Sequence, residues 1–194
     1  MIDYKDFDGP ITLENIKGKA VVLDDALMPE DHMMLEKELL DFRRFPWYMG
    51  SGNVAGTGED KGHRDLYLYH TLFAIDSEPS PWWGLFNPLW NMLNPMAFVR
   101  VRCNLDVGRS VPHEHGFHND YDNIVSAVYY VNDNNGATKF ENGEVVRSKA
   151  NRIVFFDSNL RHTTVVATDV RARILVNINY LPSEMEDLKI ESQW

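Results

Sequence analysis

The stretch FVRVRCNLD, residues 98–106, decides the fold of this chain. Apolar side chains alternate in it with charged or amide side chains, which is the period of a β-strand with one buried face. Its polar positions are Arg100, Arg102, Asn104 and Asp106. The stretch RARILVNINY, residues 171–180, repeats the pattern, with Arg171, Arg173, Leu175, Asn177 and Asn179 on one side. Two such faces either meet solvent or line a cavity, and a cavity of guanidinium and amide groups suits a small dicarboxylate.

Further segments have the composition of β-strands and of the turns that join them. They are residues 20–24 (AVVLD), 124–131 (IVSAVYYV), 137–140 (ATKF, before the turn pair Asn142-Gly143) and 152–156 (RIVFF). Two segments, 29–42 and 80–93, instead have helical features, with a proline near the start and apolar side chains along the segment. The sequence therefore predicts a mainly β fold with flanking α-helices, of the sandwich or jelly-roll kind.

Length and composition narrow the class of protein. At ~150 residues per domain, 194 residues predict a single domain. We divide it into an amino-terminal part with helices (1–97), a β core (98–182) and a tail (183–194). A net charge of −10 disfavours nucleic acid as a partner. One cysteine permits no internal disulfide, and no apolar run suits a signal peptide or membrane span. We expect a cytoplasmic protein, or one of the host cytoplasm if a phage encodes it.

Three of the seven histidines fall in the segment VPHEHGFHNDYD, residues 111–122. His118 and Asp120 are two positions apart, so in an extended chain their side chains project to the same side. His162 follows the apolar strand at 152–156. Two imidazoles and one carboxylate that leave other coordination positions open form the facial triad of non-haem Fe(II) oxygenases. The spacing by itself leaves open that these are structural or surface histidines.

The order of the motifs resembles that of a known family. His118-Asn119-Asp120 is followed by AVYYVN (127–132), GATKF (136–140), IVFF (153–156), His162 and RILVN (173–177). This order is similar to that of the 2-oxoglutarate- and Fe(II)-dependent dioxygenases, in particular their prolyl-hydroxylase-like branch and its small phage and bacterial members. Residues 20–40 resemble the lead-in of that branch, so most of the chain is covered. The resemblance implies a double-stranded β-helix, a jelly roll with a cupin-like core.

Carried over by position, the resemblance makes His118, Asp120 and His162 the Fe(II) ligands and the catalytic centre. It implies 2-oxoglutarate as the small-molecule cosubstrate and O2 as the oxidant, and ascorbate could serve as the reductant. One departure is Ala137, where the family commonly has a second glycine, and a strand tolerates this alanine.

The resemblance also implies a pocket for the cosubstrate. Its distal carboxylate would pair with Arg173, because the following ILVN matches the strand pattern of the family. Arg171 is the alternative, since the family usually places this basic residue nine or ten positions after the second histidine. Tyr130 matches a tyrosine that holds the same carboxylate, although a plain core tyrosine is an equal alternative. Thr138 resembles a residue that lines the pocket.

We expect hydroxylation of an unidentified substrate, and the branch favours a peptide or protein residue such as proline. Residues 45–61 form a glycine-rich segment that predicts either a lid carrying Trp47 and Tyr48 or a plain surface loop. A capping-box pattern at 183–186 predicts a short helix or a frayed end.

Two other classes of function stay open. One is a cupin-like metal-binding protein without oxygenase activity, in which His113, His115 and His162 hold zinc. In the oxygenase interpretation, the first two of these histidines belong to the loop that enters the iron-bearing strand. The other class is a structural or interaction β-sandwich without a metal.

Overall fold

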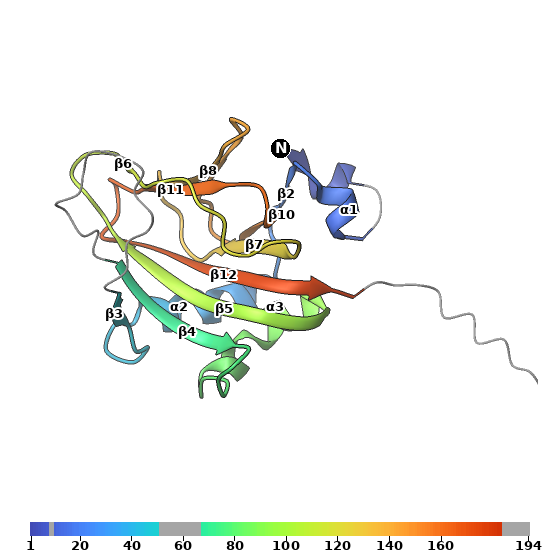
Figure 1. The fold of residues 1–194 in the computed structure, drawn as a ribbon. Helices are drawn as coiled ribbons and strands as arrows, with labels where there is room; N and C mark the ends of the chain where they lie inside the picture. The colour runs from blue at the N-terminus through green and yellow to red at the C-terminus, as the bar shows by residue number, and fades with distance from the viewer. Residues whose placement is uncertain (8–9, 51–66, 184–194) are drawn as a thin grey trace, which may run out of the picture.

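The computed structural model describes residues 1–7, 10–50 and 67–183, which form two facing β-sheets with helices on the outer side of the larger one (Figure 1). The larger sheet has the strand order β1-β2-β10-β7-β12-β5-β4-β3, and the smaller sheet has the order β6-β11-β8-β9. The strands of the larger sheet are β1 (Ile2–Asp3), β2 (Ala20–Leu23), β3 (Tyr48–Gly50), β4 (Tyr67–Ala74), β5 (Pro95–Val107), β7 (Val125–Tyr130), β10 (Arg152–Asp157) and β12 (Ala172–Pro182). Those of the smaller sheet are β6 (His113–Glu114), β8 (Ala137–Phe140), β9 (Val145–Arg147) and β11 (His162–Val166).

The helices are short apart from α2. They are η1 (Tyr4–Asp6), α1 (Leu13–Ile16), α2 (Pro29–Leu40), η2 (Trp83–Phe86) and α3 (Asn87–Leu93). The predicted helix at 80–93 is thus divided into η2 and α3. Pro88 lies in the first turn of α3, where its missing N–H has no partner to lose.

The antiparallel pair β5 and β12 explains the two-faced sequence pattern. In their register Arg173 lies opposite Asp106, and Asn177 lies opposite Arg102. The apolar face of the pair packs against the helices in a core that includes Val101, Cys103, Ile174, Val176, Leu35, Leu39, Phe86 and Leu89. The polar face therefore turns toward the smaller sheet, as Figure 1 lets the reader follow.

A second apolar core closes one end of the space between the sheets. It joins side chains of both sheets, namely Ala20, Val22, Val128, Tyr130, Phe140, Val146, Val154, Phe156 and Leu175. Because this end is filled, the remaining interior beside β4, β5 and β12 is the part that can hold a ligand.

Some elements differ from the sequence expectations. Strands β4 and β11 were not predicted, and Arg171 precedes β12 as an exposed bend residue and so does not share the inner face with Arg173. The predicted helix at 183–186 and the part of the proposed lid at 51–61 lie outside the described residues, apart from Ser183.

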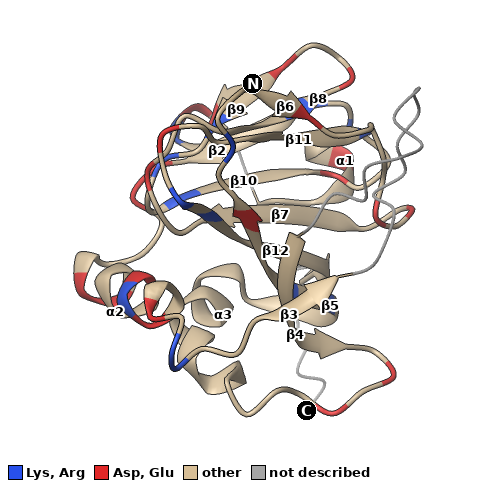
Figure 2. Cartoon of the chain, turned by 90° about the vertical axis from the view of Figure 1, so that its left-hand side faces the viewer, with Lys and Arg blue, Asp and Glu red and all other residues tan. Residues whose placement is uncertain are grey.

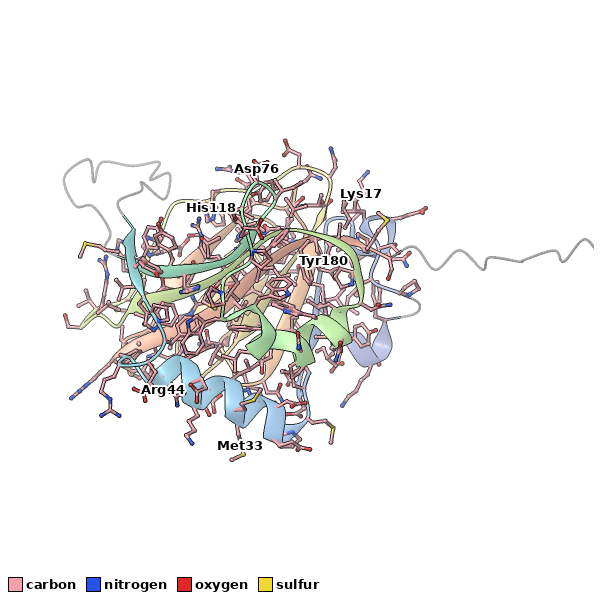
Figure 3. The ribbon with its side chains drawn as sticks, turned by 90° about the horizontal axis from the view of Figure 1, so that it is seen from below. Lys17, Met33, Arg44, Asp76, His118 and Tyr180 are labelled. Carbon is pink, nitrogen blue, oxygen red and sulfur yellow. The ribbon has the colours of Figure 1, made fainter. Side chains whose placement is uncertain are left out.

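The outer surface of α2 is mixed in character. It carries acidic and basic side chains (Figure 2), and Met33, which is 64% exposed, points away from the sheet (Figure 3). No helix in the described ranges is long and apolar enough to cross a membrane.

Candidate metal centre

Two distant segments bring His118 and His162 together. They form an isolated antiparallel bridge, in which each backbone N–H donates to the carbonyl of the other residue, at 3.0 and 2.9 Å. Their ring centroids are 4.7 Å apart. Phe156 packs edge-on against the His162 ring, with a centroid distance of 4.8 Å. The structure thus brings together the two histidines that the motif order paired.

Asp120 completes the group but is held by other side chains. One carboxylate oxygen, Oδ1, lies 3.9 Å from His118 Nε2 and 3.0 Å from a guanidinium nitrogen of Arg100. The other, Oδ2, accepts a hydrogen bond of 2.8 Å from the Asn177 amide. Burial by itself raises the pKa of Asp120, but the surrounding groups, with Arg100 foremost, outweigh it and lower the pKa, so the carboxylate is ionised.

The three residues line one cavity of about 360 Å³. Its other walls come from both sheets and are rich in polar groups. They are Tyr67, Arg100, Arg102, Asn104, Asp106, His115, Val128, Thr138, Thr164, Leu175 and Asn177. The size and the few convergent polar groups are those of a small-molecule site.

The protonation of the two imidazoles suits metal binding. Burial lowers the pKa of His162 to about 4, with a further contribution from His118, so the ring of His162 is neutral near pH 7. His118 Nδ1 lies 3.2 Å from the Gly116 carbonyl. In the neutral ring this contact assigns the proton to Nδ1 and leaves the lone pair on Nε2, the atom nearest Asp120.

The buried His162 predicts a pH dependence of stability in the metal-free protein. Between pH 6.5 and about 4 the unfolded chain binds a proton at His162 that the folded chain does not bind. The free energy of unfolding should therefore fall as the pH is lowered through this window, by on the order of 3 kcal/mol. Urea unfolding at several pH values in the presence of a chelator measures this. His162→Gln should flatten the curve, and an unchanged pH dependence in that variant would contradict the assignment.

The chemistry of the donors fits Fe(II). The distance between His118 and Asp120, however, is longer than that between two ligands of one ion. Two imidazoles and a carboxylate are the facial-triad donors, and all three line one cavity. Two ligands ~2.1 Å from one ion at a right angle are ~3 Å apart, which is less than the 3.9 Å between His118 and Asp120. Within the described ranges, no group of three His, Cys, Asp or Glu side chains has a metal-holding arrangement.

Arg173 lies one side chain behind the cavity wall and is fully buried. Its Nη1 donates to Asp106 at 2.8 Å, and its Nε donates to the Ser148 hydroxyl at 2.9 Å. Its Nη2 is buried and lacks a hydrogen-bond partner in the described part of the chain. This donor is the feature of the structure that fits a cosubstrate carboxylate. Asp106 was not singled out by the sequence reasoning, and it already neutralises this arginine.

Tyr130 and Thr138 adjoin this arginine. The Tyr130 hydroxyl donates to Thr138 Oγ1 at 2.8 Å, and the Arg173 guanidinium lies 5.6 Å from the Tyr130 ring centroid. Burial raises the pKa of Tyr130, so its hydroxyl stays protonated. Of the two, Thr138 lines the cavity.

Three predicted site residues lie elsewhere. Arg171 is exposed and outside the cavity lining. Trp47 is half-buried against Phe45, with ring centroids 5.0 Å apart, and Tyr48 at the start of β3 is 55% exposed. Neither aromatic side chain lines the cavity.

The alternative zinc set does not converge. His113 pairs with Val166 on β11, four residues along that strand from His162. Four residues of a strand span ~13 Å, which is too far for two ligands of one ion. His115 is nearer, because its N–H donates to Thr164 and it lines the cavity.

Comparison with known proteins identifies the fold. No family model matches the sequence, and no curated protein matches it. Among solved structures, a prolyl hydroxylase from Trichoplax adhaerens, in complex with a peptide fragment, aligns with a TM-score of 0.61 at 13% identity over 88% of this chain and 86% of that one. A 2OG-Fe(II) oxygenase family oxidoreductase from Burkholderia pseudomallei gives 0.57 at 12% over 83% and 84%.

The epimerase SnoN, in complex with Fe3+, alpha ketoglutarate and nogalamycin RO, gives a TM-score of 0.55 at 12% identity over 84% of this chain and 78% of that one. The chain has the fold of the 2-oxoglutarate- and Fe(II)-dependent oxygenases. The predicted double-stranded β-helix is thereby confirmed, as is the prolyl-hydroxylase-like resemblance at the level of the fold. In this oxygenase fold the cavity lies between the two sheets, and β5 and β12 supply its polar floor.

Sequence reasoning missed several residues of the site. It placed Arg100, Asp106 and Asn177 on the polar faces of their strands, but not their partners, which depend on how the strands pair. It missed Tyr67 and Thr164 because their strands, β4 and β11, were not predicted.

Proposed function

We propose that this protein is an Fe(II)- and 2-oxoglutarate-dependent dioxygenase that hydroxylates its substrate. The observation that carries the proposal is that His118, Asp120 and His162 line one cavity, with the open donor of Arg173 behind its wall. The shared fold supports it, because two of the similar solved structures are a prolyl hydroxylase and a 2OG-Fe(II) oxygenase family oxidoreductase.

The residues have distinct tasks under this proposal. His118, Asp120 and His162 would hold the iron, and the iron and cosubstrate together would supply activation of O2 and oxidative decarboxylation of 2-oxoglutarate. Asp120 would bind the iron through Oδ1, the oxygen that contacts Arg100, while Asn177 can keep its hydrogen bond to the second oxygen. Asn177 then orients the carboxylate.

For the cosubstrate, Arg173 would bind the distal carboxylate of 2-oxoglutarate through Nη2. Ser148, Asp106 and the Tyr130 ring fix the plane of the guanidinium before the ligand arrives. A preorganised, desolvated fork of this kind gives a strong charge-assisted contact. Thr138, which already accepts from Tyr130, would line the pocket beside it.

For the substrate, we propose a residue of a peptide or protein, such as proline. The support is the fold likeness to the prolyl hydroxylase from Trichoplax adhaerens, whose structure is a complex with a peptide fragment. Succinate release with candidate peptides, followed by mass spectrometry for one added oxygen atom, tests this class.

Anaerobic titration tests the function itself. Addition of Fe(II) and 2-oxoglutarate to the purified protein should produce a visible metal-to-ligand charge-transfer band and should raise the melting temperature by ligand linkage. Metal binding without the band would favour a metal-binding protein that is not an oxygenase. The absence of any metal binding would overturn both functions.

A further inference from the structure

Among the described residues, Arg102 is the cavity arginine without an ionic partner. In the part of the chain that the structure describes, Arg100 pairs with Asp120 at 3.0 Å. Likewise, Arg173 pairs with Asp106 at 2.8 Å. Arg102 makes no such pair there, and its Nε is buried without a hydrogen-bond partner. Burying a donor that has no partner among the described residues is costly, so this position suits an acceptor supplied by a bound ligand.

Aromatic rings hold both cavity arginines of β5 in place. The Arg102 guanidinium lies 4.7 Å from the centroid of the Tyr69 ring, and that of Arg100 lies 5.1 Å from the Tyr121 ring. Stacking restricts the plane of a guanidinium and leaves its edge available. The edge of a guanidinium matches the two oxygens of a carboxylate, and restricting it in advance lowers the entropy lost on binding.

The register of the sheet separates Arg102 from the proposed cosubstrate arginine. Arg102 lies opposite Asn177, whereas Arg173 lies opposite Asp106, four residues further along β5. Four residues of a strand span ~13 Å. Arg102 therefore serves a different carboxylate from the one that we assign to Arg173.

The net charge of the cavity also favours an anionic group on the substrate. Counted over the described residues, three arginines, Arg100, Arg102 and Arg173, face two carboxylates, Asp106 and Asp120. A ferrous ion and the dianionic cosubstrate would cancel each other, so one positive charge is left in a partly desolvated cavity. This local excess is opposite in sign to the net charge of −10, so the overall composition does not produce it. An anionic substrate group would neutralise it.

We propose that Arg102, with Arg100 beside it, binds a carboxylate of the primary substrate. This inference rests on the proposed dioxygenase function but not on its peptide class, and it requires that the substrate carry a carboxylate. Because a cavity of about 360 Å³ is near the lower end of the ~300–1,000 Å³ usual for ligand sites, the acid is small. It is either a free organic acid or one acidic side chain of a peptide.

Matched acids and amides test the proposal. The protein is loaded with Zn(II) and N-oxalylglycine, a cosubstrate analogue that does not react, and is titrated calorimetrically at low salt. The probes are propionate against propionamide, and acetyl-Gly-Asp-Gly-amide against its Asn counterpart. We expect at least one acid to bind about tenfold more tightly than its amide. Preference for propionate indicates a free acid, and preference for the peptide indicates an acidic side chain.

Substitutions test whether Arg102 causes the preference for an acid over its amide. Arg102→Ala should remove it, while Arg102→Gln keeps the length of the side chain and serves if the alanine variant does not fold. Arg43→Ala is the matched control, because that arginine side chain is 90% exposed. The affinity for N-oxalylglycine should stay within about twofold of wild type in all three variants. Equal binding of acid and amide, an acid preference that survives loss of Arg102, or an equal loss of N-oxalylglycine affinity would overturn the proposal.

Titrations of the metal-free protein distinguish a failure of the proposed function from a failure of this inference. The same titrations are repeated on metal-free protein, in which Arg102 and its surroundings are as described. Failure to bind metal and N-oxalylglycine counts against the function alone. Equal binding of acids and amides in both forms counts against the carboxylate subsite alone.

Discussion

Asp120→Ala should abolish the charge-transfer band with Fe(II) and 2-oxoglutarate and any turnover of the cosubstrate. The side chain is the only carboxylate close to both His118 and His162 among the described residues, so its loss removes one of three proposed ligands. Loss of a partner outside the ligand set typically costs ~10–100-fold, and a ligand should cost more than ~100-fold. Anaerobic absorption spectra and succinate release measure the two effects.

Controls separate this loss from unfolding. Asp24→Ala also removes a carboxylate from an ion pair, here with Arg152 and Lys149, but it lies outside the cavity lining and should leave the band unchanged. Asn177→Ala removes the hydrogen bond to Asp120 and should weaken metal binding by about tenfold. A band of normal intensity in folded Asp120→Ala would refute the assignment of the iron ligands.

Replacement of Arg173 should have the second largest effect, on cosubstrate affinity. We expect Arg173→Leu to raise the dissociation constant of 2-oxoglutarate by ~100-fold, since loss of one partner in a buried charge pair costs ~2–5 kcal/mol. The variant should also lose ~3 kcal/mol of stability, because Asp106 would be left in a largely buried position without its cation. Titration of 2-oxoglutarate by the charge-transfer band and urea unfolding measure the two quantities.

Two further variants separate the effect on 2-oxoglutarate affinity from the effect on stability. Adding Asp106→Asn to Arg173→Leu removes the unpaired carboxylate, so it should restore part of the stability and none of the affinity. Asp106→Asn alone leaves the Arg173 charge unneutralised and should tighten 2-oxoglutarate binding severalfold. Wild-type affinity in folded Arg173→Leu would move the carboxylate role to another cation of the cavity.

The fold was largely predictable because its signals are local. The alternation in 98–106 and 171–180 depends on which side of a strand each residue occupies, and it predicted one polar face, for which it left solvent and a cavity open; the structure places that face on the cavity. Strands β4 and β11 escaped prediction. The run HTTVV of β11 alternates weakly, and β4 has no polar face that would mark it as a strand.

The sequence alone determined the order of the motifs, the ligand candidates His118, Asp120 and His162, and the place of Arg173 on the polar face of its strand. Only the tertiary structure decided which partners these side chains have. Asp120 is held by Arg100 and Asn177, Arg173 is neutralised by Asp106, and Arg102 has no carboxylate partner among the residues that the structure describes. The physical reason is that strand periodicity fixes the side of the sheet for each residue, whereas an ion pair depends on register between strands that are far apart in sequence.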